Sequence, residues 1–432
     1  MKNKLGFLFA VGLMIVASVV TPVRAWVPMF VTLSFAIAMI GIYGNANCRR
    51  VVPGWLLAVG VGFIFCRAMQ GAIKYPELTL YYIRLVLGNA LYVFLPIAIN
   101  FAIVAYADYK QFRKFVIAML IMTFPFLLLT IVADVGMSRT QIAVAVQMSR
   151  QAIQEAEEIN RSGVMMYGAI HSLMFIAVAA VMQIRNLTVK RDKVLYALFA
   201  ATVVLTVIRS GFGYATYTTL MLVVLALAGA KNLSIVFMWL AMVAILFLIL
   251  WKTGVLIAIL EAVQQGFGYQ NVIGSKAEEL AAILGGRVYE ASDFYGRLDV
   301  YGRSWQEFLR HPFWGTDDQT RLGGHAYWID TLGCWGFTGF VVEALMYFVA
   351  FRYVLKALPR GIKYYFVICV VAFVGICFVK AGAFHAQVPI LFGMTVPMLL
   401  FREDDFYTAS NNIRRMFRLP PRMFGNRNWM SW

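Results

Sequence analysis

The chain has 432 residues, of which 61% are hydrophobic and only 14% are charged. Soluble domains carry about a quarter charged residues, so this composition excludes an ordinary soluble protein and indicates a polytopic helical membrane protein. The formal net charge of +17 does not indicate nucleic-acid binding, because no basic stripe or binding motif lies outside the apolar segments. In a membrane protein, excess Lys and Arg marks cytoplasmic loops instead.

Apolar segments long enough to cross a bilayer recur along the whole chain. We therefore predict an all-α fold with about twelve transmembrane helices, a large helical extracytoplasmic loop at 252–333 and a basic cytoplasmic tail at 402–432. Residues 1–251 hold the first nine helices and residues 334–401 hold the last three. The predicted spans are about 5–22, 27–44, 51–73, 80–107, 115–133, 164–184, 194–209, 213–230, 233–251, 334–354, 364–381 and 384–401.

The distribution of Lys and Arg predicts the orientation of these helices. With the N-terminus in the cytoplasm, every cytoplasmic loop holds at least one Lys or Arg, and the opposite loops hold far fewer when 252–333 is left aside. Both termini are therefore expected inside and the long loop outside. The first helix, ending near Val23-Arg24-Ala25, also resembles a signal peptide. We favour a retained helix because Arg24 is a poor cleavage context.

Two outer segments have helical patterns of their own. Met137–Asn160 has the spacing of an interfacial helix. In the long loop, Ser275-Lys276-Ala277-Glu278 has the form of a capping box, and Gly285-Gly286 is expected to end the helix that it starts. A second helix is expected from about Leu298 to Arg310, with Trp305, Phe308 and Leu309 buried, before His311-Pro312 stops it.

Several cations and a histidine fall in the outer third of separate spans. Arg67 and Arg84 lie inside spans, where a charge costs at least a few kcal/mol, and Arg209, Lys380 and His385 have the same depth. Arg67 and Arg84 could instead extend to the interface, and Lys380 and His385 could be solvated. As a cluster these groups would bind an anion such as a lipid diphosphate, because Arg offers phosphate a planar pair of donors.

No metal or cofactor is predicted. The five cysteines form no CxxC pair, and the four histidines have no metal-ligand spacing. Asp317 and Asp318 are adjacent and do not form a DxD pair, and no P-loop or dinucleotide fingerprint occurs. If a diphosphate leaves during a reaction, arginines would have to stabilise its developing charge.

A compact motif lies between Gly296 and Phe340. It contains Arg297, the helix stop His311-Pro312-Phe313-Trp314-Gly315, Gly324-His325-Ala326-Tyr327, and a Gly-rich approach to the next span from Gly333 to Gly339. Together with Ile208-Arg209-Ser210-Gly211 between two spans, it resembles the O-antigen polymerase and O-antigen ligase superfamily of bacterial envelope glycosyltransferases. The likeness covers residues 190–345. Ala326 and Ile208 depart from the common Asn and Ser of that family, which affects the subfamily assignment.

The resemblance implies a C-type glycosyltransferase-like fold in the bacterial inner membrane with its active site facing the periplasm. Arg209 and Arg297 would hold the diphosphate of an undecaprenyl-diphosphate-linked oligosaccharide. Arg67, Arg84 and Lys380, predicted from their depth in the spans, would also bind that diphosphate. His325 would be the general base for an inverting displacement. His385 would lie behind these residues. Asp330 would either orient His325 or cap the following helix.

Three functions remain open at this point. The leading one is a polysaccharide polymerase for O-antigen, capsule or exopolysaccharide, which would join lipid-linked repeat units and work with a chain-length regulator protein. An O-antigen ligase would use the same donor and transfer the finished glycan to a lipid A core or a protein. A lipid-linked oligosaccharide flippase belongs to another class, but transporters show related halves with charges near the midplane. We see no internal repeat in this chain.

Overall fold

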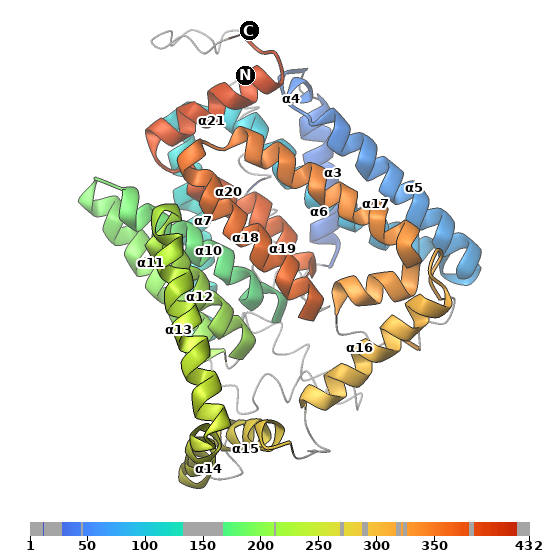
Figure 1. The fold of residues 1–432 in the computed structure, drawn as a ribbon. Coiled ribbons are helices and arrows are strands. Elements are labelled where there is room, and N and C mark those ends of the chain that lie inside the picture. The colour runs from blue at the N-terminus through green and yellow to red at the C-terminus, as the bar shows by residue number, and fades with distance from the viewer. Residues whose placement is uncertain are drawn as a thin grey trace.

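The structure is a computed structural model, and it describes residue 12 and residues 28–44, 46–132, 167–210, 213–267, 272–286, 293–316, 321–322, 326–379 and 384–420. Within these ranges the chain is helical and contains no strand (Figure 1). The prediction of an all-α protein is therefore confirmed for the described residues.

Six helices of the described residues are long and apolar enough to cross a membrane. A seventh span is possible if Ile245–Lys252 and Val255–Gly266, which meet at an 80° bend, are counted together. The protein is thus consistent with a polytopic membrane protein. The count of about twelve stays a prediction. The six helices are α5 (Gly54–Lys74), α6 (Thr79–Tyr106), α7 (Tyr109–Val132), α10 (Tyr167–Asn186), α17 (Tyr327–Ala357) and α18 (Arg360–Val379).

The remaining helices are shorter, carry more charges, or form the bent pair just described. They are α3 (Pro28–Gly44), α4 (Ala46–Arg50), η1 (Pro76–Leu78), α11 (Lys190–Arg209), α12 (Gly213–Ala228), η2 (Ala230–Asn232), α13 (Leu233–Lys252), α14 (Val255–Phe267), α15 (Val272–Leu284), α16 (Asp293–Arg310), α19 (Phe384–Ile390), the π-helix η4 (Leu391–Thr395), α20 (Val396–Leu399) and α21 (Glu403–Met416).

The core of the bundle contains a broken helix formed by α19, η4 and α20. A π-turn leaves backbone carbonyls without their helical partners, and in an apolar interior these must be satisfied by other groups. Asn100 Nδ2 donates to the Phe392 carbonyl at 2.6 Å, and Gln183 Nε2 donates to the Met398 carbonyl at 2.7 Å. Both amide side chains are buried. Asn100 therefore satisfies the π-turn, and Gln183 satisfies the last carbonyls of α20.

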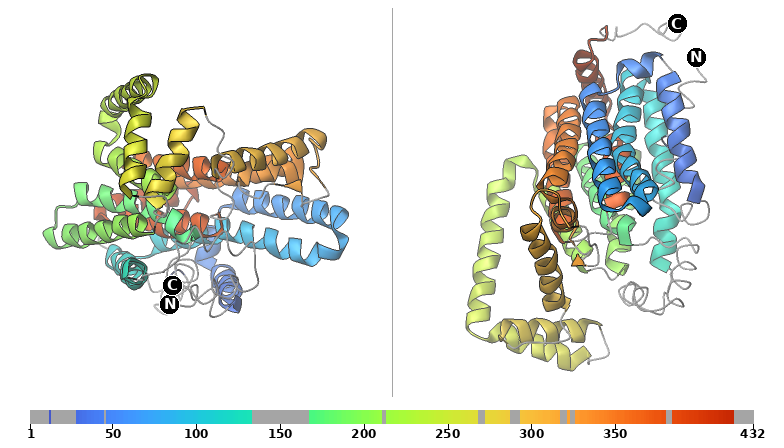
Figure 2. Two further views of the ribbon diagram at one scale, coloured as in Figure 1. Left: turned by 90° about the horizontal axis from the view of Figure 1, so that it is seen from below. Right: turned by 90° about the vertical axis from the view of Figure 1, so that its right-hand side faces the viewer.

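The two ends of the bundle carry different elements. α4 and α21 lie at one end, and α14, α15 and α16 lie at the other (Figures 1 and 2). The first turns of α7 and α11 are tied together by Arg113 and Asp192 at 2.5 Å. α7 begins directly after α6 ends, near α21. The last residue of α11, Arg209, consequently lies toward the end that carries α16.

Two predictions about the long loop need correction. α15 begins at Val272, so Ser275 lies inside the helix and is not its cap, although the helix ends before Gly285 as predicted. α16 begins at Asp293 and not at Leu298, and it ends at Arg310 as predicted. The Met137–Asn160 helix lies outside the described residues.

The apolar face of α16 was also predicted wrongly. Trp305 and Leu309 are 47% and 61% exposed, and among the described side chains of the helix, 299–310, the buried ones are Ser304 and Glu307. Gly333 of α17 approaches so closely that a Cβ there would meet the Ser304 carbonyl at 2.7 Å. A small residue is thus needed at this contact, while the large apolar side chains face away from the protein.

Candidate functional site

The site is built around a bend in α17. Gly336 has φ 64° and ψ −172°, which separates a first segment (Tyr327–Trp335) from a second (Phe337–Ala357). The Tyr327 hydroxyl donates to Glu343 Oε1 across this bend. Residues sixteen apart in a straight helix would be separated by about 24 Å. The first segment therefore folds back toward the second, and its N-terminus lies inside the protein.

The helix stop after α16 docks onto this bend through backbone hydrogen bonds. The Phe337 amide donates to the Pro312 carbonyl at 2.7 Å, and the Thr316 amide donates to the Gly333 carbonyl at 2.8 Å. The Thr338 hydroxyl donates to the Phe313 carbonyl at 2.7 Å. The two halves of the sequence motif consequently form one folded unit.

Two glycines make this docking possible. Gly315 and Gly336 both have positive φ, of 74° and 64°, a conformation that L side chains rarely adopt. A Cβ on Gly315 would lie 2.3 Å from the Cys334 carbonyl carbon, and one on Gly336 would lie 2.5 Å from the Phe313 carbonyl carbon. Because the neighbouring atoms are backbone, they cannot move aside without breaking the unit.

One face of α5 holds the docked unit with polar side chains. Arg67, Gln70 and Lys74 are spaced by three and four residues, which places them on one side of the helix. Gln70 Nε2 donates to Thr338 Oγ1 at 2.9 Å. Lys74 Nζ donates to the Cys334 carbonyl at 2.9 Å and also to the Trp314 carbonyl. This lysine therefore bridges the helix stop and the first segment of α17.

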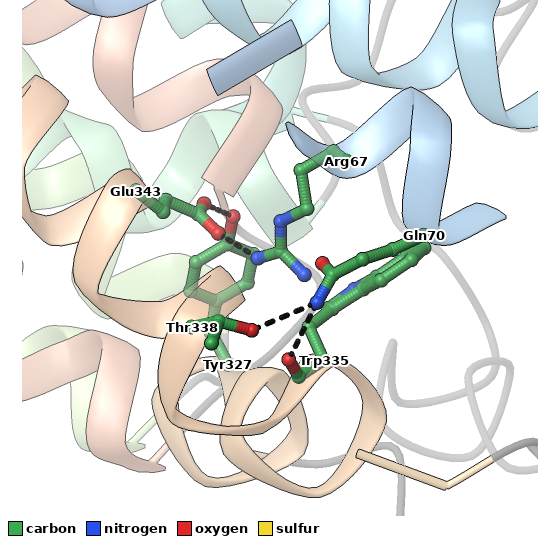
Figure 3. A network of polar contacts seen from close by, with 6 residues as sticks. All are labelled: Arg67, Gln70, Tyr327, Trp335, Thr338 and Glu343. Atoms are coloured by element: carbon green, nitrogen blue, oxygen red, sulfur yellow. Dashed lines mark hydrogen bonds and ion pairs between the residues drawn. The ribbon is translucent and has the colours of Figure 1, made fainter. Parts of the chain in front are cut away.

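Arg67 forms a buried ion pair with Glu343 of α17 (Figure 3). The two residues are 2% and 1% exposed. The guanidinium also lies 4.5 Å from the centre of the Trp335 ring, where a cation is attracted by the π-system. Sequence reasoning predicted Arg67 as a diphosphate ligand and missed Glu343. The available signal was that a charge inside a membrane normally has a partner there.

Arg209, Arg84 and Arg297 are carried by three different helices. Arg209 ends α11, and its side chain is exposed. Arg84 lies near the start of α6, and Arg297 lies in the second turn of α16. The side chains of Arg84 and Arg297 lie outside the described residues. The structure therefore gives their places on the helices but no contact among the three.

The other predicted residues adjoin described segments. His325 and Lys380 lie outside the described residues, as does the side chain of His385 on α19. Ala326, directly after His325, is fully buried. The carbonyl of Val379, directly before Lys380, accepts a hydrogen bond from the Tyr301 hydroxyl at 3.0 Å. α16 thus contacts the end of α18 next to Lys380.

Asp330 links α16 to the start of α17. One carboxylate oxygen accepts from Ser304 Oγ at 2.6 Å, and the other accepts from the Ala326 amide at 2.9 Å. A carboxylate near a helix N-terminus is favourable because it satisfies an amide that has no helical partner. These bonds fit the capping role that the sequence left open beside an orienting role for His325.

No group of three or more His, Cys, Asp or Glu side chains in the described part of the chain could hold a metal ion. Comparison with protein-family models found no match for this chain, and comparison with curated proteins found none. The assignment of function therefore depends on the residues and their arrangement.

Proposed function

We propose that this protein is a polysaccharide polymerase of the bacterial inner membrane. It would join undecaprenyl-diphosphate-linked repeat units at the periplasmic face, with both of its termini in the cytoplasm. The observation that carries the proposal is the docking of the helix stop onto the bend of α17, through Gly315 and Gly336. The halves of the motif that resembles the polymerase and ligase superfamily are thereby a single structural unit, which a chance likeness would not require.

The position of the other elements also supports this proposal. The chain leading away from His325 begins at buried Ala326 and continues to Tyr327, whose hydroxyl is bound to Glu343. Arg209 is the last residue of α11 and lies toward the end of the bundle that carries α16 (Figure 1). A general base one residue before the buried Ala326 and a cation at an exposed position would suit a donor that has a lipid tail and a charged head.

The proposed reaction is an inverting displacement at the anomeric carbon of the donor sugar. His325 accepts the proton of the acceptor hydroxyl, and the hydroxyl oxygen forms the new bond to that carbon. The bond from carbon to the diphosphate oxygen breaks, and its electron pair leaves with the diphosphate. Arg209 and Arg297 stabilise the charge that develops there. Arg84 and Lys380 would add to the positive potential around the leaving group.

The first experiment replaces these residues one at a time. Arg209→Ala, Arg297→Ala and His325→Ala should each abolish glycan chain growth in cells while the protein remains in the membrane. Arg297→Lys should also be impaired, because a point charge does not replace two parallel donors. Arg303→Ala is the matched control on α16, since Arg303 is exposed and pairs with Asp299. Normal polymer length in all three alanine variants would refute the site.

The glycan profile of a deletion strain distinguishes the candidate functions. Single repeat units on the usual acceptor indicate a missing polymerase. Long chains that remain on the lipid carrier indicate a missing ligase, and lipid-linked units that accumulate in the inner leaflet indicate a missing flippase. The purified protein should extend lipid-linked units with metal chelated and without nucleotide; a strict requirement for either would contradict the mechanism.

A further inference from the structure

α16 has three distinct faces. Its buried face holds Ser304 and Glu307 against α17. Its charged face holds Arg303 and Arg310, both exposed, and with 3.6 residues per turn these two lie on one side of the helix. Its third face is apolar and exposed. It is formed by Trp305 and Leu309 together with the half-buried Phe308, whose ring lies 5.2 Å from that of Trp305.

The exposed apolar face of α16 does not end with the helix. Phe313 and Trp314 in the helix stop are also exposed. The Thr338 hydroxyl and the Phe337 amide bind the carbonyls of Phe313 and Pro312, so the exposed Phe337 ring belongs to the same region. From there an exposed apolar stripe continues along α17 at intervals of three and four residues, through Phe337, Val341, Leu345 and Phe348.

That stripe identifies what covers the apolar face. The second segment of α17 belongs to a candidate membrane span, and an exposed apolar stripe on such a span faces lipid. The helix stop that follows α16 adjoins the start of this stripe through its hydrogen bonds to Phe337 and Thr338. Tryptophan is enriched where a membrane meets water, and surface-bound helices carry Arg and Lys beside their apolar face. Arg303 and Arg310 are the exposed cations beside this face, and each also pairs with an acid of the same helix, Asp299 and Glu307 respectively.

We infer that α16 lies along the boundary between lipid and water, on the surface of the bilayer. Trp305 and Leu309 insert among the lipid chains, together with Phe313 and Trp314 of the helix stop. Arg303 and Arg310 lie at the level of the lipid phosphates. The loop at 252–333 is therefore not wholly immersed in water. The inference needs only the membrane class of the protein and does not depend on the proposed reaction.

Where the proposed function also holds, this location determines how the donor arrives. Arg297 lies two turns before Ser304 on the same helix. A helix at phosphate level meets the diphosphate of a lipid-linked donor while the lipid tail stays in the membrane. The donor then approaches sideways within the leaflet, and only the acceptor comes from water.

The test places a fluorescent label at single positions around α16. In a chain whose five native cysteines are replaced by alanine, Trp305→Cys and Leu309→Cys are labelled with NBD. Arg303→Cys and Asp299→Cys are the matched controls, because both residues are exposed on the charged face. Each variant is reconstituted into phosphatidylcholine–phosphatidylglycerol vesicles, and its melting midpoint must match that of the unlabelled protein.

At positions 305 and 309, the label should emit at shorter wavelength and be quenched by lipids that carry a nitroxide on the acyl chain. At positions 299 and 303, it should be quenched by aqueous iodide. Iodide quenching at all four positions would overturn the inference. Protection of positions 305 and 309 from both quenchers would also overturn it, because protein, a second copy or another partner, would then cover this face. Phe313→Cys repeats the test outside the helix.

Discussion

The ion pair between Arg67 and Glu343 predicts an unusual pattern of stability. Both residues are almost completely buried, and removal of one partner from such a pair costs about 3–5 kcal/mol because the other charge stays unpaired. Replacement of both partners by apolar residues of similar size is often neutral. We therefore expect Arg67→Met and Glu343→Met each to lower the free energy of unfolding strongly, and the double variant to be much closer to the original protein.

The Tyr327 hydroxyl sharpens this prediction. It donates to Glu343 in a part-buried contact, and the double variant removes this acceptor, a loss that costs up to about 1–3 kcal/mol. Adding Tyr327→Phe removes that hydroxyl. The triple variant should therefore be more stable than the double variant, although Tyr327→Phe alone removes a hydrogen bond from the original protein and should destabilise it.

The assay is thermal unfolding in detergent, followed by the loss of monomer on size-exclusion chromatography. Arg303→Met is the matched control, because Arg303 also pairs with an acid, Asp299, but the two side chains are 49% and 74% exposed. Exposed pairs contribute about 0–1 kcal/mol. The reasoning is refuted if Arg67→Met costs no more than the control, or if the double variant is as unstable as the worse single variant.

Two further predictions concern other parts of the chain. Gly315→Ala and Gly336→Ala should each destabilise the protein by more than the roughly 1–2 kcal/mol of a left-handed backbone, because the new Cβ would also overlap backbone atoms. Gly361→Ala is the control and should be close to neutral, because nothing lies within 4 Å of the added Cβ. Equal melting midpoints for all three variants would contradict the docking of the helix stop onto α17. Burial raises the pKa of the Cys48 thiol to about 11. The rate of its labelling by maleimide should therefore be low at pH 7 and rise about tenfold per pH unit up to that pKa. A plateau of the rate near pH 8.5 would contradict this prediction and show an accessible thiol.

The helices of this protein were predictable where local signals determine them. The stop at His311-Pro312 and the end before Gly285 depend on residues within one turn, and both are found as predicted. The starts of α15 and α16 were predicted wrongly. The sequences around Ser275 and Leu298 suit a helix start, but both helices begin earlier in the chain. The division of α17 into two segments at Gly336 was also missed, since only the docking of residues 312–315 forces this residue out of helical geometry.

The site was less predictable because its contacts join distant parts of the chain. Arg67 and Glu343 are 276 positions apart, and no local pattern pairs them. Lys74 directly follows the predicted span 51–73 and no role was predicted for it, yet it binds three backbone carbonyls. Trp305 and Leu309 were wrongly predicted to be buried in protein. An amphipathic pattern shows that one face of a helix is apolar, but it does not show whether protein or lipid covers that face.

The ion pair also changes which cations can serve a diphosphate. Arg67 was expected to contribute, but one of its terminal nitrogens is bound to Glu343, and the pair as a whole carries no net charge. A dianion would gain little attraction from a neutral pair, and it would have to displace Glu343 into an apolar surrounding to gain more. Arg67 is therefore better explained as the residue that fixes α17 to α5. In steady-state assays, the Arg67→Met and Glu343→Met double variant should keep the KM for the lipid-linked donor while kcat falls. Arg209→Ala, at an exposed position, should weaken donor binding itself. A large rise in donor KM in the double variant would return Arg67 to the phosphate site.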